Sequence, residues 1–160
     1  MKKTFLLFGT ILIIGCSSNK NEFSVILDIE EVLSETEELR LNKLIKEHER
    51  KTTNEIAIIT TPNWGGYDNS LDFAINSGNK LGVGKANKDN GVVIIFSKTL
   101  KETRITTGYG TERVLKDELV KQFIDSLMLP HFRKDEFYEG ILAGTQAVIT
   151  HLELPGNKIQ

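Results

Sequence analysis

Two short apolar runs place the strongest limit on how this chain can fold. Residues 55–61 and 92–97 are each rich in β-branched side chains, which is typical of strands buried inside a sheet. A helix is predicted between them, from Ser70 to about Leu81, so the chain crosses over through a helix before the second strand begins. We therefore expect the two strands to lie parallel, joined by a right-handed connection.

The remaining elements complete an α/β pattern. A third strand, Thr103–Thr107, follows residues 92–97 after a short turn and predicts an antiparallel hairpin. Residues 23–29 are interpreted as an extended approach to the domain. Helices are predicted from Ser34 to about Lys51, from about Lys116 to Met128, ending before Pro130, and from about Asp135 to Glu153. This order predicts a three-layer α/β/α sandwich, Rossmann-like in outline, around a small mixed sheet.

The first predicted helix has a recognisable start. Ser34 and Glu37 have the spacing of a capping box, in which each side chain bonds the backbone N–H of the other residue. His48 lies on the apolar stripe of the same helix. We interpret His48 as a partly buried helix-face histidine and not as a metal ligand.

The N-terminus has the three parts of an export signal. Lys2 and Lys3 precede a largely apolar run, Thr4–Ile14, and Gly15 precedes Cys16. The run is too short to cross a bilayer as a helix, although a retained N-terminal anchor is the alternative. Residues 13–16 resemble the lipobox of bacterial lipoproteins. That resemblance implies cleavage before Cys16 and diacylation of its thiol, usually with a third acyl chain on the new amine, which gives stable membrane anchoring.

These features divide the chain into four parts. We expect a signal peptide over residues 1–15, a lipidated N-terminus and tether over 16–27, a folded domain over 28–153 and a tail over 154–160. Cys16 is the one cysteine, so no intrachain disulfide can form. The expected location is the bacterial cell envelope, on a lipid-anchored protein that faces the periplasm or the cell surface.

Charge narrows the classes of partner. The formal net charge of the 160 residues is −2, and loss of the two lysines of the signal peptide leaves 18 basic against 22 acidic residues, or −4. A nucleic-acid-binding protein needs a basic face, so we expect no nucleic-acid partner. The glycine pair at residues 82 and 84 lacks a third glycine and a preceding strand, so we also expect no nucleotide cofactor.

The hairpin predicts one acidic site. The start of strand 92–97 and the end of strand 103–107 lie at the same end of the sheet, which brings Asp89 near Glu112 and Asp117. Asn90 and the Tyr109 hydroxyl are expected nearby as supporting groups. Oxygen ligands of this kind suit a hard cation such as Ca²⁺ or Mg²⁺, and the nitrogen and sulfur ligands preferred by zinc or copper are not among them.

Simpler explanations compete with that site. An aspartate at a helix start is a common cap, and Asn-Gly is a common turn. Asp68 and Asp72 belong to the opposite end of the sheet and are ranked lower, although another strand order would reverse that ranking. Other catalytic patterns are weak: no P-loop or Gly-x-Ser-x-Gly motif is present, and surface pairing explains Arg104 and Arg113 more simply than phosphate binding does. The three histidines, His48, His131 and His151, show no ligand spacing.

Several short motifs in order resemble the TPM-domain family, which includes thylakoid-lumen phosphatase-like proteins, photosystem II repair proteins and many bacterial envelope proteins. The resemblance covers about residues 28–153 and rests on residues 32–34, 89–91, 108–110, Leu115, Asp117, 130–133 and 140–144. It implies an α/β/α sandwich without a nucleotide site, and divalent-cation binding, calcium in particular, in some members. Acid phosphatase activity has been attributed to plant members. No catalytic nucleophile carries over to this chain.

Three functional hypotheses follow. The first is a lipid-anchored accessory module of the cell envelope that binds Ca²⁺ or Mg²⁺ and a protein partner. The second is a metal-assisted phosphomonoesterase, in which the cation polarises a phosphate and activates water. The third is a tethered scaffold whose acidic residues bind nothing.

Overall fold

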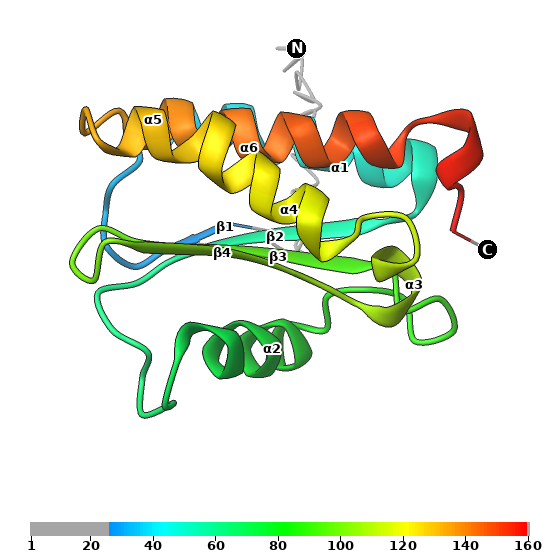
Figure 1. Cartoon of the computed structure of the whole chain (residues 1–160), viewed down its shortest axis with the longest axis horizontal. Coiled ribbons are helices and arrows are strands. Elements are labelled where there is room, and N and C mark those ends of the chain that lie inside the picture. The colour runs from blue at the N-terminus through cyan, green and yellow to red at the C-terminus, as the bar shows by residue number, and fades with distance from the viewer. Residues whose placement is uncertain (1–25, 160) are drawn as a thin grey trace, which may run out of the picture.

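The computed structural model describes residues 26–159, which form a four-stranded mixed sheet covered on both faces by helices (Figure 1). The strands follow one another across the sheet in chain order: β1 (Ile26–Asp28), β2 (Glu55–Thr60), β3 (Gly91–Ser97) and β4 (Glu102–Thr107). β1, β2 and β3 are mutually parallel, and β4 is antiparallel to β3. The predicted parallel pair and the predicted hairpin are both confirmed.

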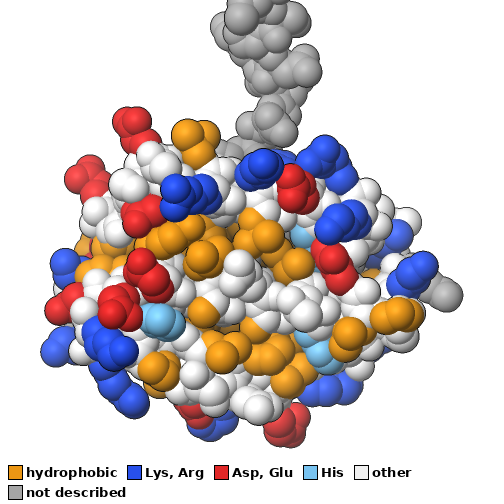
Figure 2. Space-filling model, turned by 90° about the horizontal axis from the view of Figure 1, so that it is seen from above, with side chains coloured by type: hydrophobic (Ala, Val, Ile, Leu, Met, Phe, Trp, Pro, Cys, Tyr) orange, Lys and Arg blue, Asp and Glu red, His pale blue; other side chains and the backbone are white. Residues whose placement is uncertain are grey.

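The helices lie in two layers, which confirms the α/β/α sandwich. One face of the sheet is covered by α1 (Glu35–Thr52), α4 (Asp117–Phe123) and α6 (Phe137–Leu152), and the other by α2 (Ser70–Leu81) (Figure 1). Each face has its own apolar cluster: alternate β3 residues, such as Ile94 and Ile95, are buried in opposite clusters. Seen from above the larger layer, Figure 2 shows bands of hydrophobic side chains with charges of both signs interspersed.

The two parallel crossovers have opposite hands. The chain steps from β1 to β2 and from β2 to β3 in the same direction across the sheet. α1 connects the first pair over one face, and α2 connects the second pair over the other (Figure 1). Equal steps through opposite faces require opposite screw senses, so one of these connections departs from the usual right-handed rule. As a result, α2 is the helix that covers the second face of the sheet, where it packs against β3 and β4 (Figure 1).

The predicted start of α1 is confirmed. Ser34 is the N-cap, its backbone N–H donates to Glu37 Oε2 at 2.7 Å, and its hydroxyl accepts from the Glu37 N–H at 3.4 Å. His48 is more deeply buried than predicted, with 1% of its surface exposed. Its Nδ1 lies 3.1 Å from Glu153 Oε1, which ties α1 to the residue that follows α6. Burial lowers the pKa of His48 despite the opposing effect of Glu153, so the ring favours its neutral form.

The prediction that the helix beginning near Lys116 ends before Pro130 is wrong. α4 continues into a π-helical turn, η1 (Ile124–Met128), and then into α5 (Leu129–Phe132). Pro130 is the second residue of α5, directly after the π turn, and it has no N–H to donate to that turn. The wider π turn therefore lets the helical path pass the proline. A second short helix that the sequence did not predict, α3 (Tyr109–Glu112), follows β4.

The signal peptide, the lipobox and Cys16 lie outside the described residues. Among residues 26–159, no helix combines the length and apolar character needed to cross a membrane.

Candidate functional site

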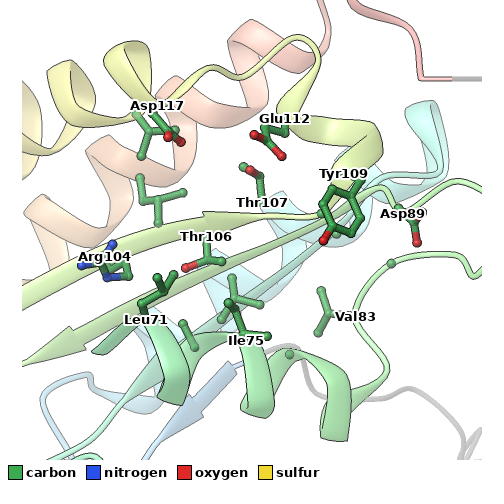
Figure 3. Close-up of a pocket in the computed structure, with 18 of the residues that line it drawn as sticks. Leu71, Ile75, Val83, Asp89, Arg104, Thr106, Thr107, Tyr109, Glu112 and Asp117 are labelled. Carbon is green, nitrogen blue, oxygen red and sulfur yellow. The ribbon is translucent and has the colours of Figure 1, made fainter. Parts of the chain in front are cut away.

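A pocket of about 880 Å³ lies along β4, between α2 on one side and α4 with η1 on the other (Figure 3). The whole of β4 from Thr103 onward contributes to its lining. α2 contributes an apolar wall that includes Leu71, Ala74 and Ile75, and the opposite wall includes Val120 and Ile124. The pocket thus follows the outer edge of the sheet.

The side chains of β4 alternate between the two walls, as a strand requires. Arg104 and Thr106 lie on the α2 side, where Arg104 Nε donates to Ser70 Oγ at 2.9 Å. Ile105 belongs to the apolar cluster on the other face, and Thr107 lies toward Glu112 (Figure 3). Any ligand of this pocket therefore meets two chemically different walls.

Asp89, Glu112 and Asp117 all lie on the lining of this pocket, together with Tyr109 (Figure 3). All four side chains are exposed, and 79% of Tyr109 is accessible. Within the described residues, none of the three carboxylates accepts a hydrogen bond or joins an ion pair. Capping does not occupy Asp117 either, because Lys116 is the N-cap of α4 and no side chain bonds there.

The three carboxylates do not form a closed metal cage. Among residues 26–159, no group of three His, Cys, Asp or Glu is close enough to hold an ion. A cation at this pocket would therefore need water or a partner for part of its coordination, which Ca²⁺ and Mg²⁺ both accept.

Asn90 lies outside the lining and has a structural role. Its side chain is buried, and its Nδ2 donates to Thr53 O at 2.8 Å and to Asn54 Oδ1 at 3.1 Å. Its Oδ1 accepts from the Lys85 N–H at 2.8 Å. These bonds join the end of α1 to the loop before β3, and so hold Asp89 in place.

Two glycines allow the loops of the pocket to meet. A Cβ atom on Gly108 would lie 2.3 Å from Asp89 O, and one on Gly110 would lie 1.9 Å from Lys88 O. The N–H of Gly110 donates to Asp89 O at 3.0 Å. The motif at residues 108–110 therefore provides close backbone contact, which brings the loop of Asp89 against α3.

Asp68 and Asp72 lie near the start of α2, at the other end of the sheet. Asp72 Oδ2 accepts from Asn69 Nδ2 at 2.9 Å, and the Asp72 N–H donates to Asn69 Oδ1 at 3.0 Å. Asp72 therefore belongs to the capping arrangement of α2. Neither aspartate lines the pocket beside β4.

Sequence reasoning missed the apolar wall of the pocket. Leu71 and Ile75 are 41% and 44% exposed, and helical spacing alone places them with Ala74 on one face of the helix predicted over residues 70–81. The signal for a binding surface was present in that pattern. It could be interpreted only once α2 was known to reach the outer edge of β4, which it contacts closely.

A comparison with protein-family models matches residues 26–151 to the TPM domain. The chain belongs to the TPM-domain family. Comparison with curated proteins gives no match.

Solved structures support the same fold. The N-terminal domain of a protein from P. gingivalis is 30% identical, with a TM-score of 0.73, and the match covers 84% of this chain and 85% of that one. The BA42 protein of Bizionia argentinensis is 23% identical, with a TM-score of 0.66 and coverage of 82% and 97%. The N-terminal domain of the cg2496 protein of Corynebacterium glutamicum is 12% identical, with a TM-score of 0.63 and coverage of 92% and 86%. At such identities the last two show the fold alone.

Other residues behind the TPM resemblance have packing roles in this chain. A Cβ atom on Gly140 would lie 2.3 Å from the Phe132 ring, and one on Gly144 would lie 2.5 Å from Met128 Sδ. The Phe132 ring in turn packs on Phe96 of β3, with ring centroids 4.4 Å apart. These small residues let η1 and α5 lie close against α6, and so position the α4 wall of the pocket.

Proposed function

We propose that this TPM domain is a lipid-anchored accessory module of the bacterial cell envelope, whose pocket beside β4 binds a divalent cation and a protein partner. The observation that carries the proposal is the set of three unpaired carboxylates, Asp89, Glu112 and Asp117, on the lining of one pocket. Elsewhere the acidic side chains Asp28, Glu30 and Glu55 each accept hydrogen bonds from backbone N–H groups. The pocket carboxylates are thus available to a ligand.

Ca²⁺ or Mg²⁺ fits the chemistry of these groups. Both are hard cations that bind carboxylate oxygens and retain water in the rest of the coordination shell. Tyr109 lies on the same lining and offers a further oxygen. Anchoring through Cys16 would hold this pocket near the membrane surface, where an envelope protein can reach it.

Calorimetric titration of the purified chain with CaCl₂ and MgCl₂ tests the cation. We expect saturable binding that is lost in the double variant Asp89→Asn/Glu112→Gln. The matched control is Asp68→Asn/Asp72→Asn, which removes the same charge at the other end of the sheet and should bind as the unaltered chain does. Equal binding by both variants would refute the assignment.

The phosphomonoesterase is a second candidate. Two positively charged side chains, those of Arg104 and Lys121, lie on the same lining as the carboxylates and favour it. Each already has a partner: Arg104 bonds Ser70, and Lys121 pairs with Asp125. The lining residues among 26–159 include no His, Cys or Ser to serve as a conventional nucleophile–base pair. Cation-dependent turnover of p-nitrophenyl phosphate that is lost in Asp89→Ala would favour this candidate, and turnover that survives it would indicate a contaminant.

A further inference from the structure

We propose that the open edge of β4 binds an extended peptide of a partner protein as a fifth strand of the sheet, with aliphatic side chains against α2 and a lysine or arginine beside Glu112 and Asp117. This proposal names the chemistry of the protein partner in the proposed function. It rests on that function in one respect, namely that the pocket has a protein partner.

The edge of β4 offers backbone groups for pairing. In the described part of the chain, β4 has a single strand neighbour, β3. The N–H of Gly108 donates to Gly91 O at 2.9 Å, and bonding alternates along an antiparallel pair, so Arg104 and Thr106 also direct their backbone groups toward β3. The N–H and C=O groups of Thr103, Ile105 and Thr107 therefore face outward, into the pocket.

The pocket has the shape that an added strand requires. β4 is six residues long, or about 20 Å at the usual rise of a strand. α2 borders this edge on one face of the sheet, and α4 with η1 borders it on the other (Figure 3). A strand lying beside β4 would direct alternate side chains toward the two walls, and its backbone would pair with the outward groups of β4.

The two walls determine the chemistry of the peptide. On the α2 side, Leu71 and Ile75 line the pocket and are 41% and 44% exposed, which suits aliphatic side chains of a ligand. On the other side, Thr107 lies near Glu112 and Asp117, whose charges are unpaired (Figure 3). A basic residue opposite Thr107 would complement these carboxylates.

A second copy of this chain fits the edge less well. If two β4 strands paired antiparallel about Ile105, each Arg104 would lie opposite a Thr106, on the α2 side of the sheet. That arrangement would place a guanidinium and a hydroxyl against the apolar wall of Leu71 and Ile75. It would also leave the carboxylates on the opposite side of the sheet without a basic partner.

The test uses the acetylated and amidated peptide Lys-Val-Thr-Ile-Thr-Val-Ser as a probe, in EDTA so that no cation contributes. When it lies antiparallel to β4, its lysine falls at the Gly108 end and its Val, Ile and Val side chains face α2. NMR titration of the full chain should shift the amides of Thr103, Ile105 and Thr107. The same peptide N-methylated at alternate residues, so that its edge bonds are blocked, should not bind, and a Glu in place of its Lys should weaken binding.

Variants locate the site. Leu71→Gln/Ile75→Gln should weaken binding by about tenfold or more, because both side chains lose apolar contact. Leu39→Gln is the matched control: Leu39 is 69% exposed on α1 and away from the pocket, so binding should be unchanged. The proposal would be overturned if the double variant and the Leu39→Gln control bound the peptide with equal affinity, or if the N-methylated peptide bound.

Hydrogen exchange in the free chain tests whether the edge is open. The amides of Thr103, Ile105 and Thr107 should exchange much faster than those of Arg104 and Thr106, and the chain should sediment as a monomer. Protected edge amides in a dimer would assign the edge to a second copy, and protected edge amides in a monomer would assign it to the chain's own N-terminal segment. Either result overturns the proposal. The cation titration, run without peptide, reports on the carboxylates and not on the backbone edge of β4, so its outcome remains separate.

Discussion

The substitution Gly110→Ala distinguishes two opposite expectations for the loop that shapes the pocket. Gly110 lies inside helix α3, where alanine is ordinarily more stable than glycine by about 0.5–1 kcal/mol. The structure predicts the reverse. The added Cβ would lie 1.9 Å from Lys88 O, whereas ordinary van der Waals contact begins at 3.4 Å, so one backbone segment must move by the difference, about 1.5 Å.

The obstructing atom cannot move easily. It is a backbone oxygen in a loop that is fixed by the bond from the Lys88 N–H to Lys85 O and by the buried side chain of Asn90. Overpacking of this kind costs about 1–3 kcal/mol, and we expect the upper part of that range because backbone is displaced. For a folded domain of this size, the corresponding fall in melting temperature is about 6–12 °C.

Urea and thermal unfolding followed by circular dichroism measure this change. Gly156→Ala is the control, because no atom lies within 4 Å of the position that its Cβ would take. The control should differ from the unaltered chain by less than about 0.5 kcal/mol. A Gly110→Ala chain that is as stable as the control, or more stable, would show that the close approach of the two loops is not required.

Three further predictions concern buried polar groups. Thr111→Val should stabilise the fold by up to about 1 kcal/mol in urea unfolding, because the fully buried Thr111 hydroxyl has no hydrogen-bond partner among the described residues. Asn90→Ala should cost about 2–3 kcal/mol in the same assay, since it removes three hydrogen bonds, one of them to the buried side chain of Asn54; a loss below about 0.5 kcal/mol would contradict the role assigned to the Asn90 side chain. His48 should make the free energy of unfolding depend on pH. Its pKa is lower in the folded chain than in the unfolded chain, so the unfolded chain takes up the proton first as the pH falls. The stability that the neutral ring allows above about pH 6.5 is therefore lost as the pH falls below that value. Unfolding free energies from pH 8 to pH 5 should therefore decrease more steeply for the unaltered chain than for His48→Gln, and equal slopes would contradict this.

Local patterns predicted most of the fold. The β-branched runs of β2 and β3, the short turn before β4 and the capping box at Ser34 each depend on nearby residues, and each element lies within a residue or two of its expected position. Pro130 misled the prediction because the π turn that accommodates it depends on packing against α6, where Gly144 leaves room for Met128. That contact joins distant parts of the chain and has no local signature.

For the candidate site, too, some features could be predicted from local patterns and others could not. The hairpin alone indicated that the loop of Asp89 and the segment of Glu112 and Asp117 belong to one end of the sheet, and the structure places all three on one pocket lining. The burial of Asn90 and the apolar wall of α2 could not be inferred, because both depend on which face of the sheet each helix covers. The opposite hands of the two crossovers decide that arrangement, and no periodicity in the sequence encodes it.

Residue-resolved NMR titration of the purified chain with Ca²⁺ decides whether the pocket carboxylates form a cation site. We expect saturable amide shifts confined to residues 89–91 and 108–117, absent from Asp89→Asn/Glu112→Gln. No shifts at millimolar Ca²⁺, or shifts centred on Asp68 and Asp72, would contradict the proposed site.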